Sequence, residues 1–448
     1  MPKGPYSVLV DKKIKEFNKS IKVDSDKSIS IRSFLLSSIS NNISEVKNAL
    51  ESEDVQSCIN CLKKLGVKIK KNKNKNYLIF GKGLGSLYAK KNTTLNCGNS
   101  GTLARLLIGI LSTTPDINIV ITGDKSLNKR SMRSLIHVMS RFGASFKPEN
   151  KNHFPLKLIS SSMPIGIKYE SGTSAQIKSA VILAGLNSYG NTTILEKQKT
   201  RDHTENILLN NSKCLKIKNK KNIIEVSGNK NLNQINMDVP SDPSSAAFFV
   251  ALCLLNKKSV LKIKKVCLNP ARIGFYLLLK KYGAKIRMIN KKKYNNELIG
   301  DILVKSSKIK PIKSSGKHYL SATDEFPIMF VIAALTKGIS KFYGIKGLSN
   351  KESNRILEMK KILSKFGVKC KSTKDSMIII GREVIKRNNL IKVDSVNDHR
   401  IAMSCFILAL ISGSRLLIKG FETVKTSSPS FLKTIKLLGG KYEIKKTS

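Results

Sequence analysis

Arginine is scarce in this chain, and the positions where it occurs mark candidate anion sites. The sequence has 13 arginines against 68 lysines. A planar guanidinium donates paired hydrogen bonds to a carboxylate or phosphate, a geometry that an ammonium does not match. Arg400 in DHRIAMS begins a strongly apolar helix, where a cation opposes the helix dipole unless an anion compensates it. KESNRI is expected to bring Lys351, Glu352 and Arg355 onto one helical turn. We therefore predict that Arg355 and Arg400 bind an anionic ligand.

Small polar residues that open helices indicate further anion contacts. In LNCGNSGTLARLL (95–107), the segment CGNSGT directs several N–H groups and the positive end of a helix dipole toward one place. VDSDKSISIR has Lys27 and Ser28 at a helix start, with Arg32 four residues beyond Ser28 on the same face. DKSLNKRSM adds Arg130, in a loop whose other basic residues are lysines. Together these motifs are typical of a site for phosphate or carboxylate groups.

Three more motifs combine hydroxyl, amide and charged side chains. SGTSAQIKSA opens a helix with Ser174 and Gln176, and VPSDPSSAAFF is expected to cap one with Ser244 and Ser245. TRDHTE (200–205) gathers a hydroxyl, an arginine, two acids and a histidine. Each motif alone is also explained as an ordinary helix cap, but their number favours a binding site.

Acidic residues next to apolar segments are candidates for proton transfer. In ATDEFPIMF, Asp324 and Glu325 directly precede an apolar run and a proline. A carboxylate that directly precedes a buried segment is expected to have a raised pKa and can act as a general acid or base. We expect one of these acids to take part in catalysis.

A repeat predicts the elements that must position these residues. Five segments pass from a helix through a glycine into a short strand: LGVKI (65–69), FGASF (142–146), YGAKI (282–286), FGVKC (366–370) and LGGKY (438–442). Glycine suits the left-handed residue that closes a helix. LLNNSKCLKI (208–217) is a sixth candidate with Asn211 in that position, and the steps between copies are 68 to 84 residues. Six α/β units, three in each half, predict two three-fold domains with a cleft between them.

Apolar periodicity predicts helices at 28–39, 55–66, 133–143, 245–255, 354–367 and 399–411. Lysine and asparagine clusters at 70–76 and 290–296 are expected to be solvated hairpin loops without a function.

Composition limits the class of protein. The chain has 448 residues and a formal charge of +51, with lysine scattered from end to end. We interpret the charge as a general compositional bias rather than a nucleic-acid surface, which remains the alternative. The eight cysteines are expected to be buried thiols, and the Cys58 and Cys61 pair has no partner motif that would complete a metal site. No apolar run approaches the ~20 residues of a membrane helix, so we expect a soluble, cytoplasmic protein.

The motifs DKSISIR, GNSGT, SAQIKSAVILAGL, TRDHTE, PSSAAFF, NPARIGF, DEFPI, KESNRI and NDHRIAMS occur in this order over nearly the whole chain. This set resembles the 5-enolpyruvylshikimate-3-phosphate synthase family. The resemblance implies an α/β (α+β) fold of two domains, each of three repeated sheet-plus-helix units in an inside-out α/β barrel, with the active site in the interdomain cleft. The implied domains are 25–240, mainly binding shikimate 3-phosphate, and 1–24 plus 241–448, carrying the acids and arginines for the chemistry.

The resemblance also implies a reaction: transfer of the enolpyruvyl group of phosphoenolpyruvate to the 5-hydroxyl of shikimate 3-phosphate, with release of phosphate. Asp324 is the implied base, and Glu352, with Lys27, the implied proton donor. Neither a metal nor an organic cofactor is implied, and we expect a monomer. The residues implied to bind shikimate 3-phosphate are Lys27, Ser28, Arg32, Ser174, Ala175, Gln176, Thr200, Asp324 and Lys351. Those implied to bind phosphoenolpyruvate are Lys27, Gly101, Arg130, Gln176, Arg355 and Arg400.

Some positions depart from the family pattern, and three alternative functions remain. The departures are Ser131, Ser241, Ser349, Asn350 and Asn354, together with the lack of a clear counterpart to a C-terminal lysine. A catalytically impaired relative is one alternative that these departures suggest. A second is UDP-N-acetylglucosamine enolpyruvyl transferase, although TGDKSLNKR lacks the cysteine that this sister enzyme generally carries in that loop. A third is a basic nucleic-acid-binding module, which the low aromatic content of 6% disfavours.

Overall fold

The protein is built from one sheet pattern that occurs six times. The computed structural model describes residues 4–211, 213–218, 222–385 and 389–446. In one sheet, β6 (Thr94–Asn96) pairs in parallel with β7 (Asn118–Thr122). The strands β9 (Leu156–Ile159) and β8 (Ser145–Lys147) then continue the sheet in antiparallel pairings. The order is therefore one parallel pair followed by two antiparallel pairs.

The other five sheets in the described part of the chain repeat this four-strand order. Their strands, in sheet order, are β14 (Met237–Asp238), β3 (Ile43–Lys47), β5 (Tyr77–Phe80), β4 (Lys68–Lys71); β10 (Lys168–Ser171), β11 (Asn191–Glu196), β13 (Ile223–Ser227), β12 (Leu215–Lys218); β2 (Asn18–Ile21), β15 (Val260–Cys267), β17 (Glu297–Lys305), β16 (Lys285–Tyr294); β18 (Lys313–Ser314), β19 (Gly338–Tyr343), β21 (Ser376–Gly381), β20 (Lys369–Ser372); and β22 (Ile391–Asp394), β23 (Leu416–Lys419), β1 (Tyr6–Val10), β24 (Glu443–Lys446).

Each repeat has one central helix that is buried on nearly every side. These helices are α1 (Lys27–Ser38), α3 (Gly101–Leu111), α6 (Ala175–Leu186), α8 (Pro243–Leu255), α11 (Phe326–Ala334) and α13 (His399–Ser412). In α8, for example, every residue from Pro243 to Leu254 is buried. A helix that is apolar all round is stable only when other elements surround it. The sequence of these segments therefore assigns them to the core.

A second helix in each repeat is buried on one face only. These helices are α2 (Glu53–Lys64), α5 (Arg133–Ser140), α7 (His203–Asn211), α9 (Gly274–Lys281), α12 (Arg355–Lys365) and α14 (Phe431–Leu437). The predicted helix-closing glycines all adopt positive φ, between +76° and +96°, and each follows one of these helices: Gly66, Gly143, Gly283, Gly367 and Gly439. The sixth candidate ends α7 at Asn211. The predicted repeat and the predicted helices are confirmed.

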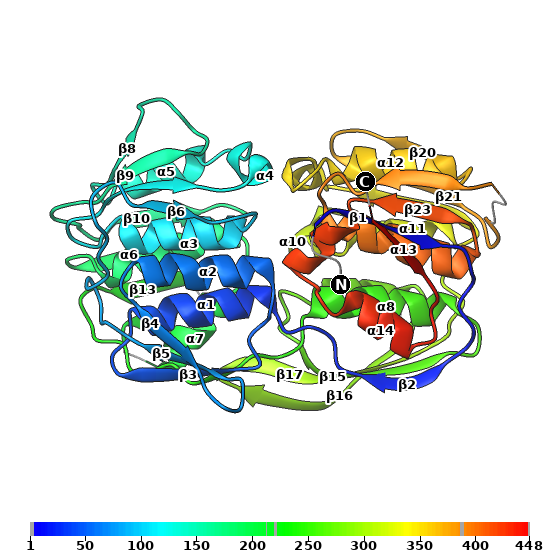
Figure 1. Ribbon diagram of the computed structural model, residues 1–448, viewed down its shortest axis with the longest axis horizontal. Coiled ribbons are helices and arrows are strands. Elements are labelled where there is room, and N and C mark those ends of the chain that lie inside the picture. Colours follow the sequence, from blue (N-terminus) through cyan, green and yellow to red (C-terminus); the bar gives the residue numbers. More distant parts are fainter. Residues whose placement is uncertain (1–3, 212, 219–221, 386–388, 447–448) are drawn as a thin grey trace. The chain divides into compact units, whose positions relative to one another are not determined.

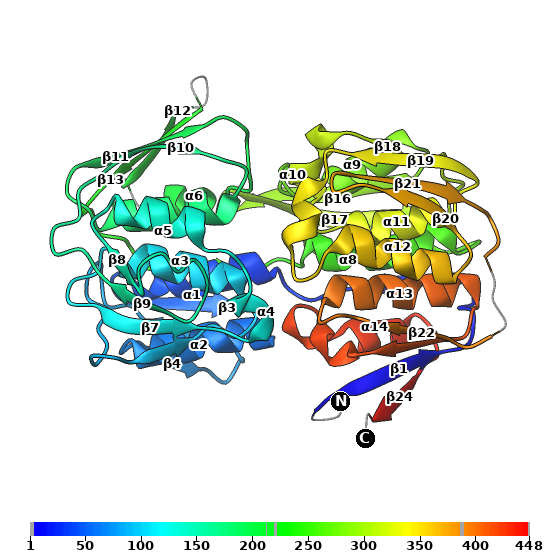
Figure 2. The ribbon, with the colours of Figure 1, turned by 90° about the horizontal axis from the view of Figure 1, so that it is seen from above.

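The described coordinates divide into two compact units with three sheets each (Figures 1 and 2). We call residues 25–239 and 293–297 the first unit, and residues 1–24, 240–292 and 298–448 the second unit. In the first unit, α3 contacts both α1 and α6; in the second unit, α8, α11 and α13 contact one another. The predicted domain limits differ from this division at Pro240 and at 293–297. Residues 293–297 belong with the first unit because Asn295 donates a hydrogen bond to the carbonyl of Asn236 and Glu297 contacts His203.

Two local predictions need correction. The cluster at 70–76 is a hairpin between β4 and β5 as expected, but most of 290–296 is strand, because β16 continues to Tyr294 in its pairing with β17. The cap of α8 is Asp242, whose side chain accepts a hydrogen bond from the Ser244 amide, so Ser244 and Ser245 lie inside the first turn. Among the described residues, no helix has the length and apolar character needed to cross a membrane.

Candidate active site

The candidate residues of the first unit gather at the N-termini of its central helices. Asp26, Ser100 and Ser174 cap α1, α3 and α6, each accepting a hydrogen bond from a backbone amide in the first turn. Lys27 and Ala175 are the first residues of α1 and α6. Uncompensated N–H groups and the positive end of each helix dipole make such termini suitable for anions. Ser174 is therefore both a helix cap and a candidate ligand.

Lys27 is held by an acid that the sequence did not indicate. Its Nζ lies 2.9 Å from Oδ2 of Asp54 on α2, and the Asp54 side chain is only 4% exposed. Ser28 follows Lys27 in the first turn, and its carbonyl accepts a hydrogen bond from Arg32 at 3.1 Å. The predicted grouping of Lys27, Ser28 and Arg32 at one end of α1 is thus observed.

Two arginines converge on Gly101. A Cβ added to Gly101 would lie 2.6 Å from Nη1 of Arg105 and 3.1 Å from Nη1 of Arg130. Arg130 also donates to Oδ1 of Asn99 at 2.9 Å. Glycine at the start of α3 thus leaves room for two guanidinium groups beside bare backbone amides. This is the arrangement that a phosphate group requires.

Arg105 also orients Gln176 and was not among the predicted site residues. Its Nη1 donates to Oε1 of Gln176 at 2.8 Å, and Nε2 of Gln176 donates to Oγ1 of Thr102 at 2.9 Å. The N-termini of α3 and α6 are joined by these contacts. The available signal was a single charged residue within the apolar helix GTLARLLIGIL.

Arg32 and Thr200 are more deeply buried than the other residues implied to bind shikimate 3-phosphate. Arg32 is 3% exposed, and its guanidinium donates to Oγ1 of Thr204 at 2.8 Å and to Oγ of Ser179 at 3.1 Å. Thr200 is 5% exposed, and both its amide and its hydroxyl donate to Oε1 of Glu196. The hydroxyl proton of Thr200 is therefore directed toward Glu196.

A buried ionic cluster supports the segment that carries Thr200. Nζ of Lys178 lies 2.6 Å from Glu196 and 2.7 Å from Glu205, and the Lys178 and Glu205 side chains are each 1% exposed. Burial opposes the charge of Lys178, but the two carboxylates outweigh it and raise the lysine pKa. Burial raises the pKa of Glu205, and Lys178 offsets this only in part. Ion pairing therefore dominates the pKa of Lys178, whereas burial dominates the pKa of Glu205.

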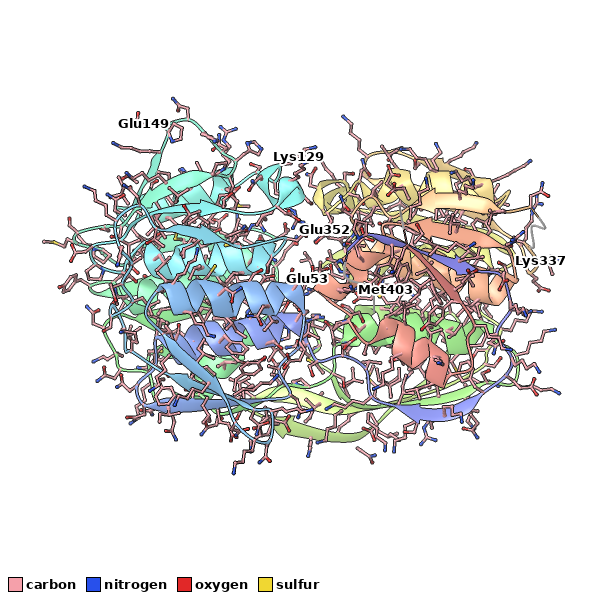
Figure 3. All side chains as sticks on the ribbon, viewed as in Figure 1. Glu53, Lys129, Glu149, Lys337, Glu352 and Met403 are labelled. Atoms are coloured by element: carbon pink, nitrogen blue, oxygen red, sulfur yellow. The ribbon has the colours of Figure 1, made fainter. Side chains whose placement is uncertain are left out.

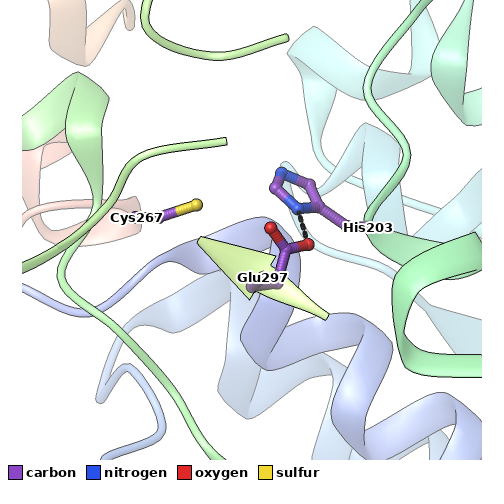
Figure 4. A group of neighbouring side chains, drawn as sticks. All are labelled: His203, Cys267 and Glu297. Atoms are coloured by element: carbon purple, nitrogen blue, oxygen red, sulfur yellow. Dashed lines mark hydrogen bonds and ion pairs between the residues drawn. The ribbon is translucent and has the colours of Figure 1, made fainter. Parts of the chain in front are cut away.

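His203 begins α7 and is anchored rather than exposed. Its Nδ1 lies 2.6 Å from Oε1 of Glu297, and both side chains are almost completely buried (Figure 4). Asn206 donates to the same oxygen at 3.2 Å. These contacts fix the TRDHTE segment.

In the second unit, Arg355 is the centre of an acidic cluster. Its Nε lies 2.8 Å from Oδ2 of Asp398, and its Nη2 lies 2.6 Å from Oε2 of Glu352. Its side chain is 1% exposed. Burial disfavours the charge, but Asp398, Glu352 and Asp324 outweigh burial and hold the Arg355 pKa above its ordinary value. Arg355 is therefore a permanent buried cation.

Asp324 lies beside both predicted arginines. Its Oδ1 is 3.6 Å from Nη1 of Arg355 and 3.9 Å from Nε of Arg400. Asp398 caps α13 by accepting the Arg400 amide at 2.9 Å, which brings Arg400 to the same helix end. The structure thus assembles Asp324, Glu352, Arg355 and Arg400, residues that the sequence places as far as 76 positions apart.

The predicted helical turn at 351–356 is wrong in one respect. Asn354 caps α12 by accepting the Leu357 amide at 3.2 Å, so Lys351 and Glu352 precede the helix instead of lying on it. Figure 3 labels Glu352 on this segment and Met403 on α13. Glu352 still reaches Arg355 because the preceding loop folds back toward the helix start.

Repeated sheet-plus-helix units, with arginines, lysines and amides collected at helix N-termini, define an α/β protein suited to multiply anionic substrates. The family model of EPSP synthase (3-phosphoshikimate 1-carboxyvinyltransferase) matches residues 12–435. The chain belongs to this family of transferases.

Relatives and solved structures agree with this assignment. The chain is 36% identical to the 3-phosphoshikimate 1-carboxyvinyltransferase of Paramagnetospirillum magneticum, covering 94% of this chain and 95% of the relative. It is 38% identical to that of Thermodesulfovibrio yellowstonii, covering 95% and 98%. The EPSP synthase of Acinetobacter baumannii has a TM-score of 0.86 and 34% identity over 98% of this chain and all of the other.

The enolpyruvyl transferase NikO of Streptomyces tendae shares the fold, with a TM-score of 0.76 at 11% identity over 99% of this chain and all of the other. The predicted fold class and the predicted family are confirmed. The family match does not favour the alternative of a UDP-N-acetylglucosamine enolpyruvyl transferase.

Proposed function

We propose that this protein transfers the enolpyruvyl group of phosphoenolpyruvate to the 5-hydroxyl of shikimate 3-phosphate and releases phosphate. This is a step of the shikimate pathway to chorismate and the aromatic amino acids. Family membership supports the reaction. The observation that carries the proposal is the position of Asp324 beside Arg355 and Arg400, because this pairs a candidate base with two cations that suit an anionic substrate.

We assign shikimate 3-phosphate mainly to the predicted domain 25–240. Ser28, Arg32, Ser174, Ala175, Gln176 and Thr200 would contact it, with Lys27 shared between the two substrates. The helix termini and the Arg105–Gln176 contact support this assignment. Because the Thr200 hydroxyl donates to Glu196, Thr200 would accept rather than donate a hydrogen bond in the complex. Asp324 and Lys351 would reach the ring hydroxyls.

We assign phosphoenolpyruvate to two sets of cations. Arg355 and Arg400, in the predicted domain 1–24 plus 241–448, would bind its carboxylate through their guanidinium groups. Lys27, Gly101, Arg130 and Gln176 would hold its phosphate. The convergence of Arg105 and Arg130 on Gly101 supports this second assignment.

The proposed chemistry is addition followed by elimination. Asp324 accepts the proton of the 5-hydroxyl while that oxygen bonds to C2 of phosphoenolpyruvate, and Glu352, with Lys27, donates a proton to C3. The resulting tetrahedral intermediate then loses phosphate and one C3 proton, which restores the carbon–carbon double bond. The reaction needs no metal and no organic cofactor in this scheme, because cationic side chains stabilise the developing negative charge.

We further propose that the protein acts as a monomer in the cytoplasm, without a specific nucleic-acid partner. Scattered lysine, rather than one basic stripe, supports the last point. Light scattering of the purified protein checks its mass, and RNA binding that persists at high salt would contradict the lack of a nucleic-acid partner.

The test is phosphate release from purified protein, measured with phosphoenolpyruvate in the presence and absence of shikimate 3-phosphate. We expect release to require both substrates and to fall by roughly 10²- to 10⁴-fold in Asp324→Asn, which keeps the shape but removes the base. Asp11→Asn, a change at an exposed aspartate, serves as the matched control and should leave the rate unchanged.

The outcomes separate the parts of the proposal. Folded wild-type protein without substrate-dependent release would contradict the reaction and favour a catalytically impaired relative. An active wild type with an equally active Asp324→Asn variant would instead reject Asp324 as the base.

A further inference from the structure

A buried cluster of charged and polar residues in the second unit lies next to Asp324 but takes no part in the proposed chemistry. It consists of Arg272, Asp242, Ser244 and Glu325, which are between 0% and 5% exposed. Arg272 comes from NPARIGF, a motif to which no role has been assigned. The cluster joins the starts of α8 and α11, two of the central helices.

The members form a continuous chain of hydrogen bonds. Nη2 of Arg272 lies 3.0 Å from Oδ1 of Asp242 and 3.1 Å from Oγ of Ser244. Asp242 Oδ1 also accepts the Ser244 amide at 2.7 Å. Ser244 Oγ in turn donates to Oε1 of Glu325. Arg272 therefore orients the serine hydroxyl, and the serine hydroxyl holds the glutamate.

Glu325 is also held through its backbone, and this restricts the preceding residue, Asp324. Its amide donates to the carbonyl of Ala322 at 3.0 Å, and its carbonyl accepts the amide of Met329 at 2.9 Å as α11 begins. With the Glu325 side chain and backbone both held, the Cα of Asp324 has little freedom to move. Asp324 lies 3.6 Å from Arg355 and 3.9 Å from Arg400, so its distance from both cations depends on where this backbone is held.

Stability alone does not account for such a cluster. Charges lose their hydration on burial, and well-packed apolar residues of similar volume usually serve a core at least as well as a buried ion pair. Beyond the first turn of α8, both helices consist of apolar residues. The polar contacts are concentrated at the helix starts, where Asp324 lies.

We propose that Arg272, acting through Ser244 and Glu325, positions Asp324 against Arg355 and Arg400 for proton transfer. Arg272 is then a positioning residue, and the inference rests on the proposed function. A displaced base loses rate because the reacting atoms no longer meet at the required distance and angle. Substrate affinity should change much less, because the arginines themselves remain in place.

The test compares Arg272→Met, Arg272→Lys, Ser244→Ala and Glu325→Gln with wild type, measuring kcat, KM for each substrate and the pH profile of kcat. Arg287→Met on β16, where the arginine is exposed, is the matched control for loss of one positive charge. We expect kcat to fall roughly 10- to 100-fold in Arg272→Met. The KM for phosphoenolpyruvate and the KM for shikimate 3-phosphate should each change by less than about threefold. Arg272→Lys should recover part of the kcat that Arg272→Met loses, because lysine restores a hydrogen-bond donor.

The pH profile is the readout that a purely structural role would not move. The ionisation of Asp324 depends on its distances from Arg355 and Arg400 and from the carboxylates of Glu352 and Asp398 at the same cluster. A displaced Asp324 should therefore move the acid limb of the kcat profile.

Ser244→Ala removes one oxygen and with it the hydrogen bond to Glu325, so it should show the same shift even if Arg272→Met fails to fold. Glu325→Gln keeps the acceptor for the Ser244 hydroxyl and should keep more of the rate than Ser244→Ala.

Two results would overturn the inference without touching the proposed reaction. One is an unchanged kcat and pH profile in the Ser244→Ala variant of an active enzyme. The other is a fall in kcat of the same size in Arg287→Met. Absence of phosphate release from the wild type would instead reject the reaction itself.

Discussion

Arg355 illustrates how a single residue combines binding and structure. It is completely buried, and carboxylates from three separate segments, Asp324, Glu352 and Asp398, lie within 3.6 Å of its guanidinium. Only a planar group with several N–H donors satisfies three partners in different directions. The acids also keep the cation charged and oriented before any substrate arrives.

Arg355→Lys should therefore weaken phosphoenolpyruvate binding although the charge is kept. We expect KM for phosphoenolpyruvate to rise at least roughly tenfold, the equivalent of about 1.4 kcal/mol, because an ammonium cannot form the paired contact. Steady-state kinetics with each substrate varied in turn gives the measurement. Arg382→Lys, at an exposed arginine, is the control, and an unchanged KM in Arg355→Lys would contradict the assignment.

At the scale of elements, the Lys178 cluster joins a central helix, a strand and a second helix. Lys178 lies on α6, Glu196 ends β11 and Glu205 lies on α7. Removing the cation from two buried carboxylates leaves them uncompensated. We expect Lys178→Met to lower the free energy of unfolding by about 3–5 kcal/mol at pH 7.

The pH dependence of that loss follows from the raised pKa of Lys178. A lysine whose folded-state pKa exceeds its unfolded value contributes fully below the unfolded pKa, which is 10.5, and loses its contribution as pH rises through the folded pKa. The difference between wild type and Lys178→Met should shrink as the pH rises above 10.5. Urea unfolding across this range measures it, with the exposed Lys197→Met as control. A difference that does not shrink above pH 10.5 would contradict the ion-pair explanation.

The helix-closing glycines provide a second test at this scale. Gly143 and Gly439 have nearly equal φ, +91° and +90°, but a Cβ at Gly143 would overlap Oγ of Ser161, whereas one at Gly439 would meet nothing within 4 Å. We expect Gly439→Ala to cost about 1–2 kcal/mol through backbone conformation alone and Gly143→Ala to cost more. Thermal and urea unfolding of the two variants distinguishes the cost of the backbone conformation from the cost of the contact with Ser161. Equal losses would show that Ser161 adjusts without cost.

At the scale of the whole molecule, the first strand of the chain completes the last repeat. The strand β1 is entirely buried and pairs with both β23 and β24. In the other repeats, the third strand of the sheet comes from the same stretch of chain as the fourth. The second unit therefore depends on contacts across more than 400 positions, such as Val8 with Ile418.

Deleting residues 1–10 should thus destabilise the second unit strongly although none of the proposed site residues is removed. Two sheet neighbours would lose their partner, and buried Tyr6, Val8 and Val10 would leave a gap in the core. Limited proteolysis with mass spectrometry should detect new cleavage in 241–448 before cleavage in 25–239. Deleting only residues 1–4 leaves β1 intact and should have little effect. If the two deletion variants resist the protease equally, this explanation is contradicted.

The sequence by itself determined the features that depend on neighbouring residues. Helix starts, helix-closing glycines and the sixfold repeat are local, because capping and left-handed backbone involve only a few consecutive positions. The arginines at helix starts were also evident, because a cation at that position is locally unfavourable. These signals were sufficient to predict the repeat, the family and most of the candidate residues.

Only the tertiary structure decided which side chains meet. The Asp54 partner of Lys27, the Arg105–Gln176 contact and the chain from Arg272 to Glu325 each join different segments of the chain. Nothing near these residues in sequence specifies the partner. The pairing arises when apolar central helices are buried against one another, because that packing brings their polar starts together and fixes their distances.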